Sequence, residues 1–288
     1  MKVRKAVIPA AGWGTRFLPA TKAQPKEMLP IVDKPAIQYI IEEAVASGIE
    51  DIIFVTGRNK KALEDHFDRS MELEVFLKEK GKAVLAEVIR NVSNLADITY
   101  VRQKEAKGLG HAILCARKFV GSEPFAVLLP DDIIQAEVPC LKQMMSVYNQ
   151  TGGNVIAVKE VPDSEVSKFG IVDGESLGNK LYRVRDLVEK PTMTDAPSRM
   201  AVIGRYIVSA TVFDLLEKTK PGAGGEIQFT DALRALCRSE DITAFEFSGT
   251  RFDVGDKMGF LQANVTFALA NEEFGDVFRS FLEKQFEK

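Results

Sequence analysis

Residues 3–16 read VRKAVIPAAGWGTR, a short apolar run that leads directly into a glycine-rich turn. The apolar pattern around Val7 and Ile8 predicts a short buried strand over Val3–Pro9. The next segment, Ala10–Pro30, has neither helical nor strand periodicity, and a loop of about twenty residues inside a compact domain is commonly functional. We therefore expect a ligand-binding loop at the carboxyl end of the first strand of an α/β sheet.

Beyond this loop, the sequence alternates between helical and strand patterns. Asp33 is predicted to cap a helix that has Pro35 in its first turn and ends at Gly48. Strands are predicted at Ile52–Thr56, Ile98–Arg102 and Phe125–Leu129, and helices at Gly110–Phe119, at Val138–Asn149 and, as two stretches, within 59–90. Such alternation requires crossover connections, so we expect a three-layer αβα Rossmann-like fold with a mostly parallel central sheet.

From Asn154 onward, the sequence changes to shorter strand-like runs. Short strands are predicted at Val155–Lys159, Gly170–Asp173, Leu181–Val188 and Met200–Val208, with helices that begin at Thr211 and Ile227. We expect these strands to extend the same sheet with antiparallel members. One domain over 1–256 and a helical C-terminal segment over 257–288 are predicted. The many apolar side chains of that segment favour packing on the domain or an oligomer interface.

Composition excludes several classes of protein. The chain has 288 residues, with 38 Lys and Arg against 41 Asp and Glu, so a nucleic-acid partner is not expected. Its three cysteines are far apart and it has two histidines, which argues against a structural zinc site. There is no nucleophile-elbow motif, so a Ser-His-Asp hydrolase is not expected. Pro9 and Gly12 interrupt the first apolar run, so a signal peptide is not expected either. No apolar run reaches membrane-spanning length. We expect a cytoplasmic protein with no membrane partner.

The loop after the first strand carries three cations, Arg16, Lys22 and Lys26, among several prolines. Phe17 stands where a dinucleotide-binding turn requires a third glycine, and the Gly-Lys-Ser/Thr ending of a phosphate loop is absent. Cations held together on a stiff loop repel one another unless an anion lies among them. A polyphosphate suits both the forked Arg and the point charge of Lys. The alternative is a solvated charged loop with turn prolines.

Residues 12–30, GWGTRFLPATKAQPKEMLP, resemble the signature of the sugar-phosphate nucleotidylyltransferases, and the similarity continues to Asp253-Val254-Gly255. The resemblance implies reversible, magnesium-dependent transfer of a uridylyl group from UTP to glucose-1-phosphate, which gives UDP-glucose and pyrophosphate. It also implies that residues 1–150 mainly bind the nucleotide and that residues 151–256 mainly bind the sugar phosphate. Family members are commonly dimers or tetramers, so a homo-oligomer is expected.

The resemblance assigns roles to residues of three kinds. Three cations would act in catalysis: Arg16 on the departing pyrophosphate, Lys26 on the reacting phosphates and Lys190 on the sugar phosphate. Asp131 and Asp253 would bind magnesium. Substrate would be bound by Ala10, Ala11, Gly12, Gly14, Thr15, Lys22, Gln103, Gly108, Gly170 and Glu189. Because the sugar phosphate is already an anionic nucleophile, no strong general base is needed, and positioning should supply most of the rate.

The residues themselves leave structural interpretations open for three of these segments. Asp131 and Asp132 follow a buried strand, where they suit a magnesium site or a simple turn equally well. Glu189 and Lys190 suit either a sugar phosphate or an exposed ion pair. Residues 103–110 suit either recognition of the uracil base or an ordinary turn into a helix.

Two other readings of the function are also open. One is a related transferase that uses dTTP or another sugar-1-phosphate. The other is a regulator that binds a sugar nucleotide without turning it over, although the loop cations and Asp131 are all present. Glu226 and Asp231 match the family but also suit helix caps. His111 and Trp13 are given no chemical role.

Overall fold

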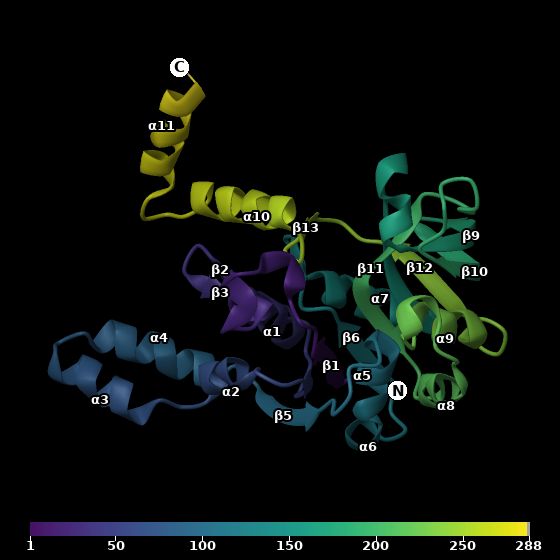
Figure 1. Cartoon of the computed structure of the whole chain (residues 1–288), viewed down its shortest axis with the longest axis horizontal. Helices are drawn as coiled ribbons and strands as arrows, with labels where there is room; N and C mark the ends of the chain where they lie inside the picture. The colour runs from purple at the N-terminus through teal and green to yellow at the C-terminus, as the bar shows by residue number, and fades with distance from the viewer. Residues whose placement is uncertain (287–288) are drawn as a thin grey trace.

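The computed structural model describes residues 1–286 and contains a nine-stranded sheet (Figure 1). In spatial order its strands are β5-β4-β1-β6-β11-β8-β12-β10-β9. Their bounds are Lys5–Ala10 for β1, Asp51–Thr56 for β4, Asp97–Arg102 for β5, Phe125–Leu128 for β6, Asn154–Glu160 for β8, Gly170–Gly178 for β9, Leu181–Glu189 for β10, Met200–Val208 for β11 and Ile242–Glu246 for β12.

Most of these strands run in one direction. β1 pairs in parallel with β4 and β6, β4 with β5, and β8 with β12. β11 is antiparallel to β6 and β8, and β10 is antiparallel to β12 and β9. Within this sheet β10 and β11 therefore run against the other strands, which confirms the prediction of a mostly parallel sheet with antiparallel additions.

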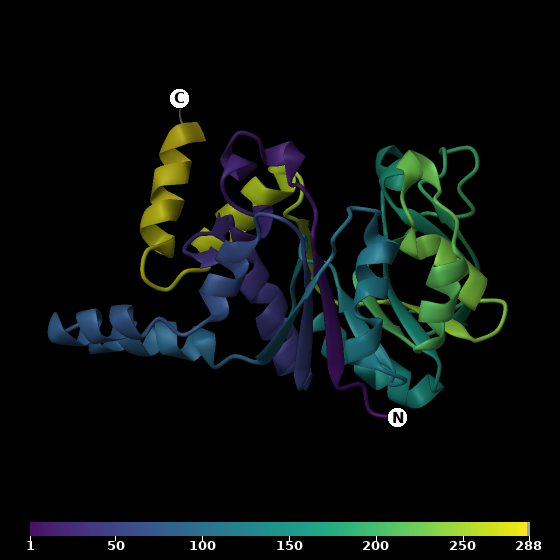
Figure 2. The ribbon, with the colours of Figure 1, turned by 60° about the horizontal axis from the view of Figure 1, so that its bottom comes forward.

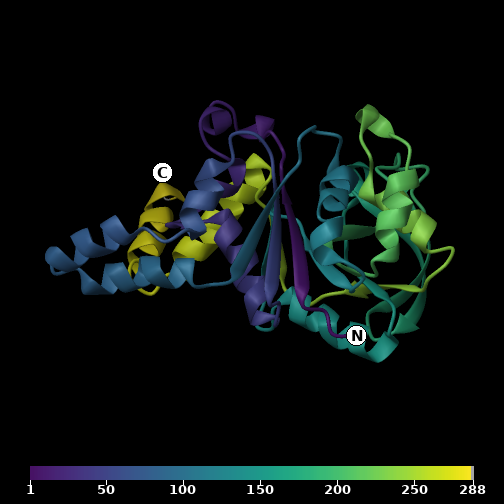
Figure 3. The ribbon, with the colours of Figure 1, turned by 90° about the horizontal axis from the view of Figure 1, so that it is seen from below.

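Helices cover both faces of the sheet and make three layers (Figures 2 and 3). Alternate residues of β1 belong to two different cores: Ala6, Ile8 and Ala10 to one, and Val7 to the other. Burial on both faces explains why this strand reads as a continuous apolar run. The first core is covered by α1 (Ala36–Ala46) and α7 (Cys140–Thr151), and the second by α5 (Leu109–Cys115), α6 (Arg117–Val120), α8 (Thr211–Lys218) and α9 (Phe229–Leu236).

The predicted cap of the first helix is wrong. Lys34–Pro35 forms the short strand β3, which pairs with β2 (Pro30–Ile31). Helix α1 therefore begins at Ala36 with Pro35 in the N-cap position. Asp33 is exposed in the turn that joins β2 to β3, so it does not cap the helix.

Two helices are predicted within 59–90. The structure has three helices in this region: α2 (Lys61–Phe67), α3 (Met71–Glu79) and α4 (Ala83–Ser93). Helices α3 and α4 form a hairpin that projects from the body of the molecule (Figures 1, 2 and 3). Hydrogen bonds from Arg69 and Arg90 hold the Glu74 carboxylate between the two helices and lower its pKa to about 2.

The sequence pattern missed five strands: β2 and β3, described above, and three more, of which two form a small separate ribbon. β7 (Asp132–Gln135) pairs antiparallel with β13 (Thr250–Asp253), and Asp253 lies opposite Asp132. The third, β12, belongs to the main sheet. Because β7 follows the turn after β6, the ribbon brings the end of the domain back to the carboxyl end of the central strands.

The C-terminal segment consists of two helices with different surroundings. Helix α10 (Lys257–Leu269) packs on the first half of the chain: the Phe260 ring lies 5.5 Å from that of Phe17, and Asn264 Oδ1 accepts a hydrogen bond from the Val32 N–H. Helix α11 (Gly275–Phe286) is mostly exposed. The last two residues of the predicted segment 257–288 lie outside the described range. None of the helices within residues 1–286 combines the length and the hydrophobicity that crossing a bilayer requires.

Candidate active site

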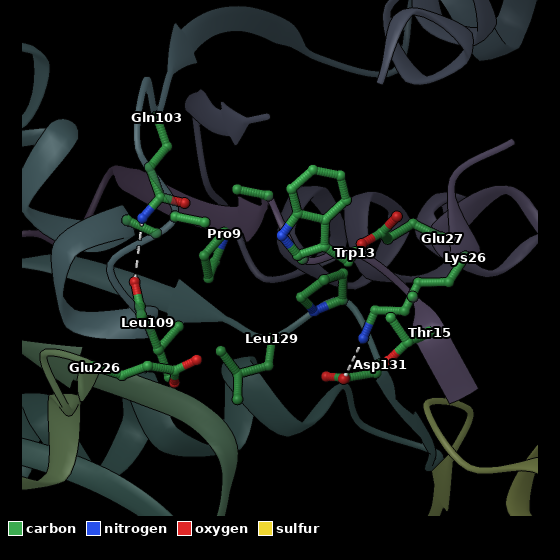
Figure 4. Close-up of a pocket in the computed structure, with 17 residues that line it drawn as sticks. Pro9, Trp13, Thr15, Lys26, Glu27, Gln103, Leu109, Leu129, Asp131 and Glu226 are labelled. Carbon is green, nitrogen blue, oxygen red and sulfur yellow. Dashed lines mark hydrogen bonds and ion pairs between the residues drawn. The ribbon is translucent and has the colours of Figure 1, made fainter. Parts of the chain in front are cut away.

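A cavity of about 430 Å³ lies at the carboxyl ends of β1 and β6, under the glycine loop. Figure 4 shows Gln103 and Glu226 at one side of it, Lys26 and Asp131 at the other, and Trp13 between them. Several of the predicted substrate contacts line this cavity: Ala11, Gly12, Gly14, Thr15, Gln103 and Gly108. Ala10 does not; it is buried at the end of β1.

The glycine loop holds its shape through one residue with left-handed backbone geometry. Gly14 has a φ of 68°, and a Cβ there would lie 3.1 Å from the Cβ of Lys26. The Gly14 carbonyl accepts a hydrogen bond of 2.7 Å from the buried Thr21 hydroxyl. Gly14 is therefore required both for the turn and for the close approach of the Lys26 segment.

Lys26 and Asp131 form the charged centre of the cavity. Lys26 Nζ lies 2.7 Å from Asp131 Oδ2, and both side chains are partly buried (Figure 4). Burial alone would lower the pKa of the Lys26 ammonium, but the Asp131 carboxylate, together with Glu27, outweighs burial and raises it. The same pairing holds the pKa of Asp131 below its usual value, against the opposing effect of burial. Both groups are therefore charged at neutral pH.

Asp131 and Asp253 face the same glycine. A Cβ on Gly255 would lie 2.9 Å from Asp131 Oδ2 and 3.1 Å from Asp253 Oδ1. Within residues 1–286, no group of three or more His, Cys, Asp or Glu side chains is placed to hold a metal. Magnesium, however, is commonly bound by one or two carboxylates together with substrate phosphates and water. The pair therefore fits a magnesium ion that binds with a phosphorylated substrate.

Arg251 forms ion pairs with the carboxylates on the acidic side of the site, and no pattern in the sequence predicted this role. Its Nη2 lies 2.5 Å from Asp132 Oδ1 and 3.4 Å from Asp253 Oδ2. Its guanidinium also lies 4.9 Å from the centre of the Phe169 ring. Asp132 is buried, and its other oxygen accepts a hydrogen bond from the Gly204 N–H. Asp132 is thus a structural neighbour of the site.

A wholly buried arginine fixes the turn that presents Asp131. Arg205, on β11, donates to both carboxylate oxygens of Glu43 on α1, at 3.0 and 2.7 Å. It also donates to the carbonyl oxygens of Leu129 and Asp132, at 3.2 and 2.7 Å. These two carbonyls lie on either side of Asp131 in the sequence, so the guanidinium fixes the backbone of the turn that carries Asp131.

Glu43→Gln is expected to lower the free energy of unfolding by about 3–5 kcal/mol, because Arg205 would remain buried without its counter-charge. Urea titration followed by circular dichroism would measure the loss. The control is Glu50→Gln, whose ion pair with Lys2 is exposed to water and should contribute little. Equal stabilities of the two variants would contradict the structural importance of the Arg205 contact.

A second buried ion pair lies beneath the glycine loop. Glu27 Oε2 is 2.6 Å from Lys60 Nζ, and the two side chains are 1% and 6% exposed. Burial lowers the pKa of Lys60, and Glu27 partly offsets this. Lys60 follows β4 while Glu27 follows Lys26 directly, so the pair ties the loop to the sheet. Sequence reasoning did not assign Glu27 to the site, although its position next to Lys26 could have indicated it.

At the other side of the cavity, Gln103 is held by two contacts. Its amide nitrogen donates to the Gly108 carbonyl at 3.2 Å and lies 2.9 Å from Nδ1 of His111. Gly108 has a φ of 96°, and a Cβ there would lie 2.7 Å from the Cβ of Glu226. Glu226 itself lines the cavity, whereas Gln228 occupies the N-cap position of α9. His111 therefore positions Gln103, and Glu226 faces the cavity instead of capping the helix.

The predicted sugar-phosphate residues form a separate cluster at the ends of β9 and β10. Glu189 pairs with Gly170 in the strand register, and its carboxylate lies 3.0 Å from Lys190 Nζ. The Thr230 hydroxyl donates to Glu189 Oε2 at 2.7 Å, a contact that sequence reasoning missed. Thr230 thus fixes the direction of the Glu189 carboxylate at the end of β10.

Two of the three loop cations approach the same place, and the third does not. Lys26 reaches Asp131, and the exposed Arg16 donates at 3.4 Å to the carbonyl of Gly255, the glycine that Asp131 and Asp253 face. Lys22 lines a second cavity on the far side of the loop. The structure therefore brings Arg16 and Lys26, but not Lys22, to the acidic side of the site.

Comparison with known proteins identifies the family of this chain. The profile of the nucleotidyl transferase family matches residues 5–269. The UTP–glucose-1-phosphate uridylyltransferase of Bacillus subtilis (strain 168) is 56% identical over 282 residues, which are 98% of this chain and 97% of the relative.

Solved structures give the same result for the fold. A UDP-glucose pyrophosphorylase complexed with UDP-glucose has a TM-score of 0.86 and 47% identity, over 93% of this chain and 100% of that one. A UTP-bound enzyme of the same kind from Acinetobacter baumannii has a TM-score of 0.88 and 40% identity, over 97% and 98% of the two chains. From its sequence, its fold and the residues gathered around Lys26 and Asp131, this chain belongs to the nucleotidyl transferase family of enzymes, among the UTP–glucose-1-phosphate uridylyltransferases.

Proposed function

We propose that this protein transfers the uridylyl group of UTP to glucose-1-phosphate and releases pyrophosphate, and that it also catalyses the reverse reaction. The observation that carries the proposal is the Lys26–Asp131 ion pair of 2.7 Å, set beside the glycine loop in a cavity large enough for a nucleotide. The printed names of the uridylyltransferase relatives support UTP and glucose-1-phosphate as the substrates.

The chemistry requires an oxygen of the sugar phosphate to form a bond to the α-phosphorus of UTP. The bond from that phosphorus to the bridging oxygen breaks, and pyrophosphate leaves with the electron pair. The nucleophile is already an anion, so the protein has to hold two polyanions in line and neutralise their charge. Lys26 would serve the reacting phosphates and Arg16 the departing pyrophosphate.

Asp131 and Asp253 would hold a magnesium ion. A metal bound there would polarise the α-phosphate and offset its developing charge. The protein contributes the fixed direction of these carboxylates: Arg205 anchors the backbone around Asp131, and the Gly255 N–H donates to Asp253 Oδ1 at 3.0 Å.

The uracil and the sugar would be bound at opposite sides of the reacting phosphates. Gln103 and the backbone near Gly108 would recognise the base, because the Gln103 amide is already oriented by His111. Glu189 would accept hydrogen bonds from glucose hydroxyls, with Thr230 orienting its carboxylate, and Lys190 would contact the sugar phosphate. Gly170 keeps the approach open, since a Cβ there would lie 3.0 Å from the Thr230 hydroxyl.

Purified protein with UTP, glucose-1-phosphate and magnesium should release pyrophosphate, measured in a coupled assay. We expect kcat/KM with UTP to exceed that with dTTP by at least about tenfold, because dTTP carries an extra methyl group at C5 of the base and lacks the ribose 2′-hydroxyl, and one such difference changes specificity by this much or more. Replacing glucose-1-phosphate by galactose-1-phosphate tests the sugar in the same way. Pyrophosphate release with dTTP but not with UTP would favour the related transferase. No pyrophosphate release with any pair of substrates would favour the non-catalytic regulator.

We also propose a homo-oligomer in the cytoplasm. The projecting hairpin and α11 expose large apolar side chains, which favours contact with a second copy. These side chains are Met71, Leu73, Val75, Phe76, Val84, Leu85 and Val88 on the hairpin, and Val277, Phe281 and Phe286 on α11.

A further inference from the structure

A second cavity of about 320 Å³ lies on the other side of the glycine loop, above the carboxyl ends of β4 and β5. It shares part of its wall with the main cavity, including Gly12, Trp13 and Gln103. The rest of its wall comes from the segment 18–25 of the loop, from residues 57–60 after β4, and from residues after β5. The two cavities are therefore neighbours separated by the glycine loop and Trp13.

The charges of the two cavities differ. The main cavity is lined by three carboxylates, from Glu27, Asp131 and Glu226, and by one cation, which is already paired. The residues that line the second cavity include four cations and, within the described part of the chain, no carboxylate. These cations are Lys22, Arg58, Lys60 and Lys104.

Three of the four cations lack a compensating charge. Lys60 is paired with Glu27, but Lys22, Arg58 and Lys104 are exposed at the rim of the cavity, and none of them forms an ion pair with any residue in the range 1–286. Like charges gathered around a hollow repel one another and raise the local concentration of anions. A small, multiply charged anion would offset this repulsion better than solvent does.

We propose that this second cavity binds a diphosphate, namely the pyrophosphate that the reaction releases in one direction and consumes in the other. The inference rests on the proposed function and adds Arg58 and Lys104 to the residues that serve it. Pyrophosphate formed beside the carboxylates of the main cavity is drawn past the glycine loop to the unpaired cations. In the reverse direction the same cations collect pyrophosphate, which then passes the glycine loop before one of its oxygens forms a bond to the α-phosphorus of UDP-glucose and glucose-1-phosphate leaves.

The test uses the double variant Arg58→Ala/Lys104→Ala, assayed in the direction of pyrophosphorolysis. We expect KM for pyrophosphate to rise roughly tenfold or more, while KM for UDP-glucose stays the same, since the removed charges are specific to the diphosphate. The control is Lys118→Ala/Lys142→Ala, which removes two exposed cations, on α6 and α7, that line neither cavity. It should stay within about twofold of the wild type, because exposed charges far from a ligand are screened by salt.

The diphosphate has two sources, and the forward reaction distinguishes them. A rise in KM for UTP in the double variant would mean that the terminal phosphates of intact UTP already reach the second cavity. An unchanged KM for UTP would mean that free pyrophosphate alone occupies it. Equal KM values for pyrophosphate in the double variant and its control would overturn the proposal, as would an equal rise in KM for UDP-glucose.

A binding measurement separates this inference from the proposed function. Trp13 is the one tryptophan of the chain and lines both cavities, so its fluorescence reports on ligands in either. Titration with pyrophosphate should change the fluorescence of the wild type and of the control at similar concentrations, and of the double variant at concentrations roughly tenfold higher. If the enzyme assays fail but this difference persists, the proposed reaction is wrong and the diphosphate site stands. If the titrations coincide, the site is wrong.

Discussion

Asp131→Asn is expected to lower kcat by about three orders of magnitude or more while the protein remains folded. The substitution keeps the shape of the side chain but removes the charge that the metal requires and that Lys26 now neutralises. Electrostatic stabilisation at the reacting phosphates supplies most of the rate in such a reaction, and losing both terms at once accounts for the size of the effect. Steady-state rates over a range of magnesium concentrations would measure it.

Asp256→Asn is the matched control for this variant. It removes one carboxylate close to the site, where Asp256 caps α10 by accepting a hydrogen bond from the Met258 N–H. We expect turnover near that of the wild type and a stability loss of about 1 kcal/mol or less, as for other N-caps. Normal turnover of Asp131→Asn at limiting magnesium would contradict the assignment of Asp131.

Lys26→Met should lower kcat by about two to three orders of magnitude, because it removes the partly buried cation proposed to serve the reacting phosphates. Its ammonium also lies against Asp131 Oδ2, one of the two carboxylate oxygens available to a metal. The variant should therefore bind Mn²⁺ alone more tightly than the wild type does, as measured by calorimetry. Lower turnover together with tighter metal binding is not what a loss of folding would produce.

Lys26→Arg separates charge from shape in the same position. It keeps the positive charge beside Asp131, so its turnover should fall between those of the wild type and Lys26→Met. Mn²⁺ binding by Lys26→Met at or below the wild-type affinity would mean that Lys26 does not compete for Asp131. Unchanged turnover in both variants would remove Lys26 from the catalytic residues.

The sequence predicted the position of the site because its signals are local. An apolar strand followed by Gly12 and Gly14 indicates a ligand loop at a sheet edge, and a second apolar strand followed by Asp131 indicates carboxylates at the same edge. Parallel neighbours place such ends side by side, and the register of β1 with β6 does so here. The cap at Asp33 was mispredicted because the two-stranded turn competes for the same residues.

Other contacts could not be predicted from spacing. Arg205 reads as one residue of an apolar strand, yet it meets Glu43 from a distant helix and the turn beside Asp131. The pairing of β7 with β13, which brings Asp253 to the site, joins two segments too short to show a period of their own. The directions of Lys22 and Lys26 likewise depend on the turns between them.

By itself, the sequence determined the alternation of strands and helices, the glycine loop and the family to which the chain belongs, since each depends on residues close together along the chain. The tertiary structure alone decided which charges meet: Lys26 with Asp131, Glu27 with Lys60, and unpaired cations around a second cavity. The physical reason is that a charge acts over a few ångströms of space, whereas sequence patterns describe local backbone geometry and not which distant faces pack together.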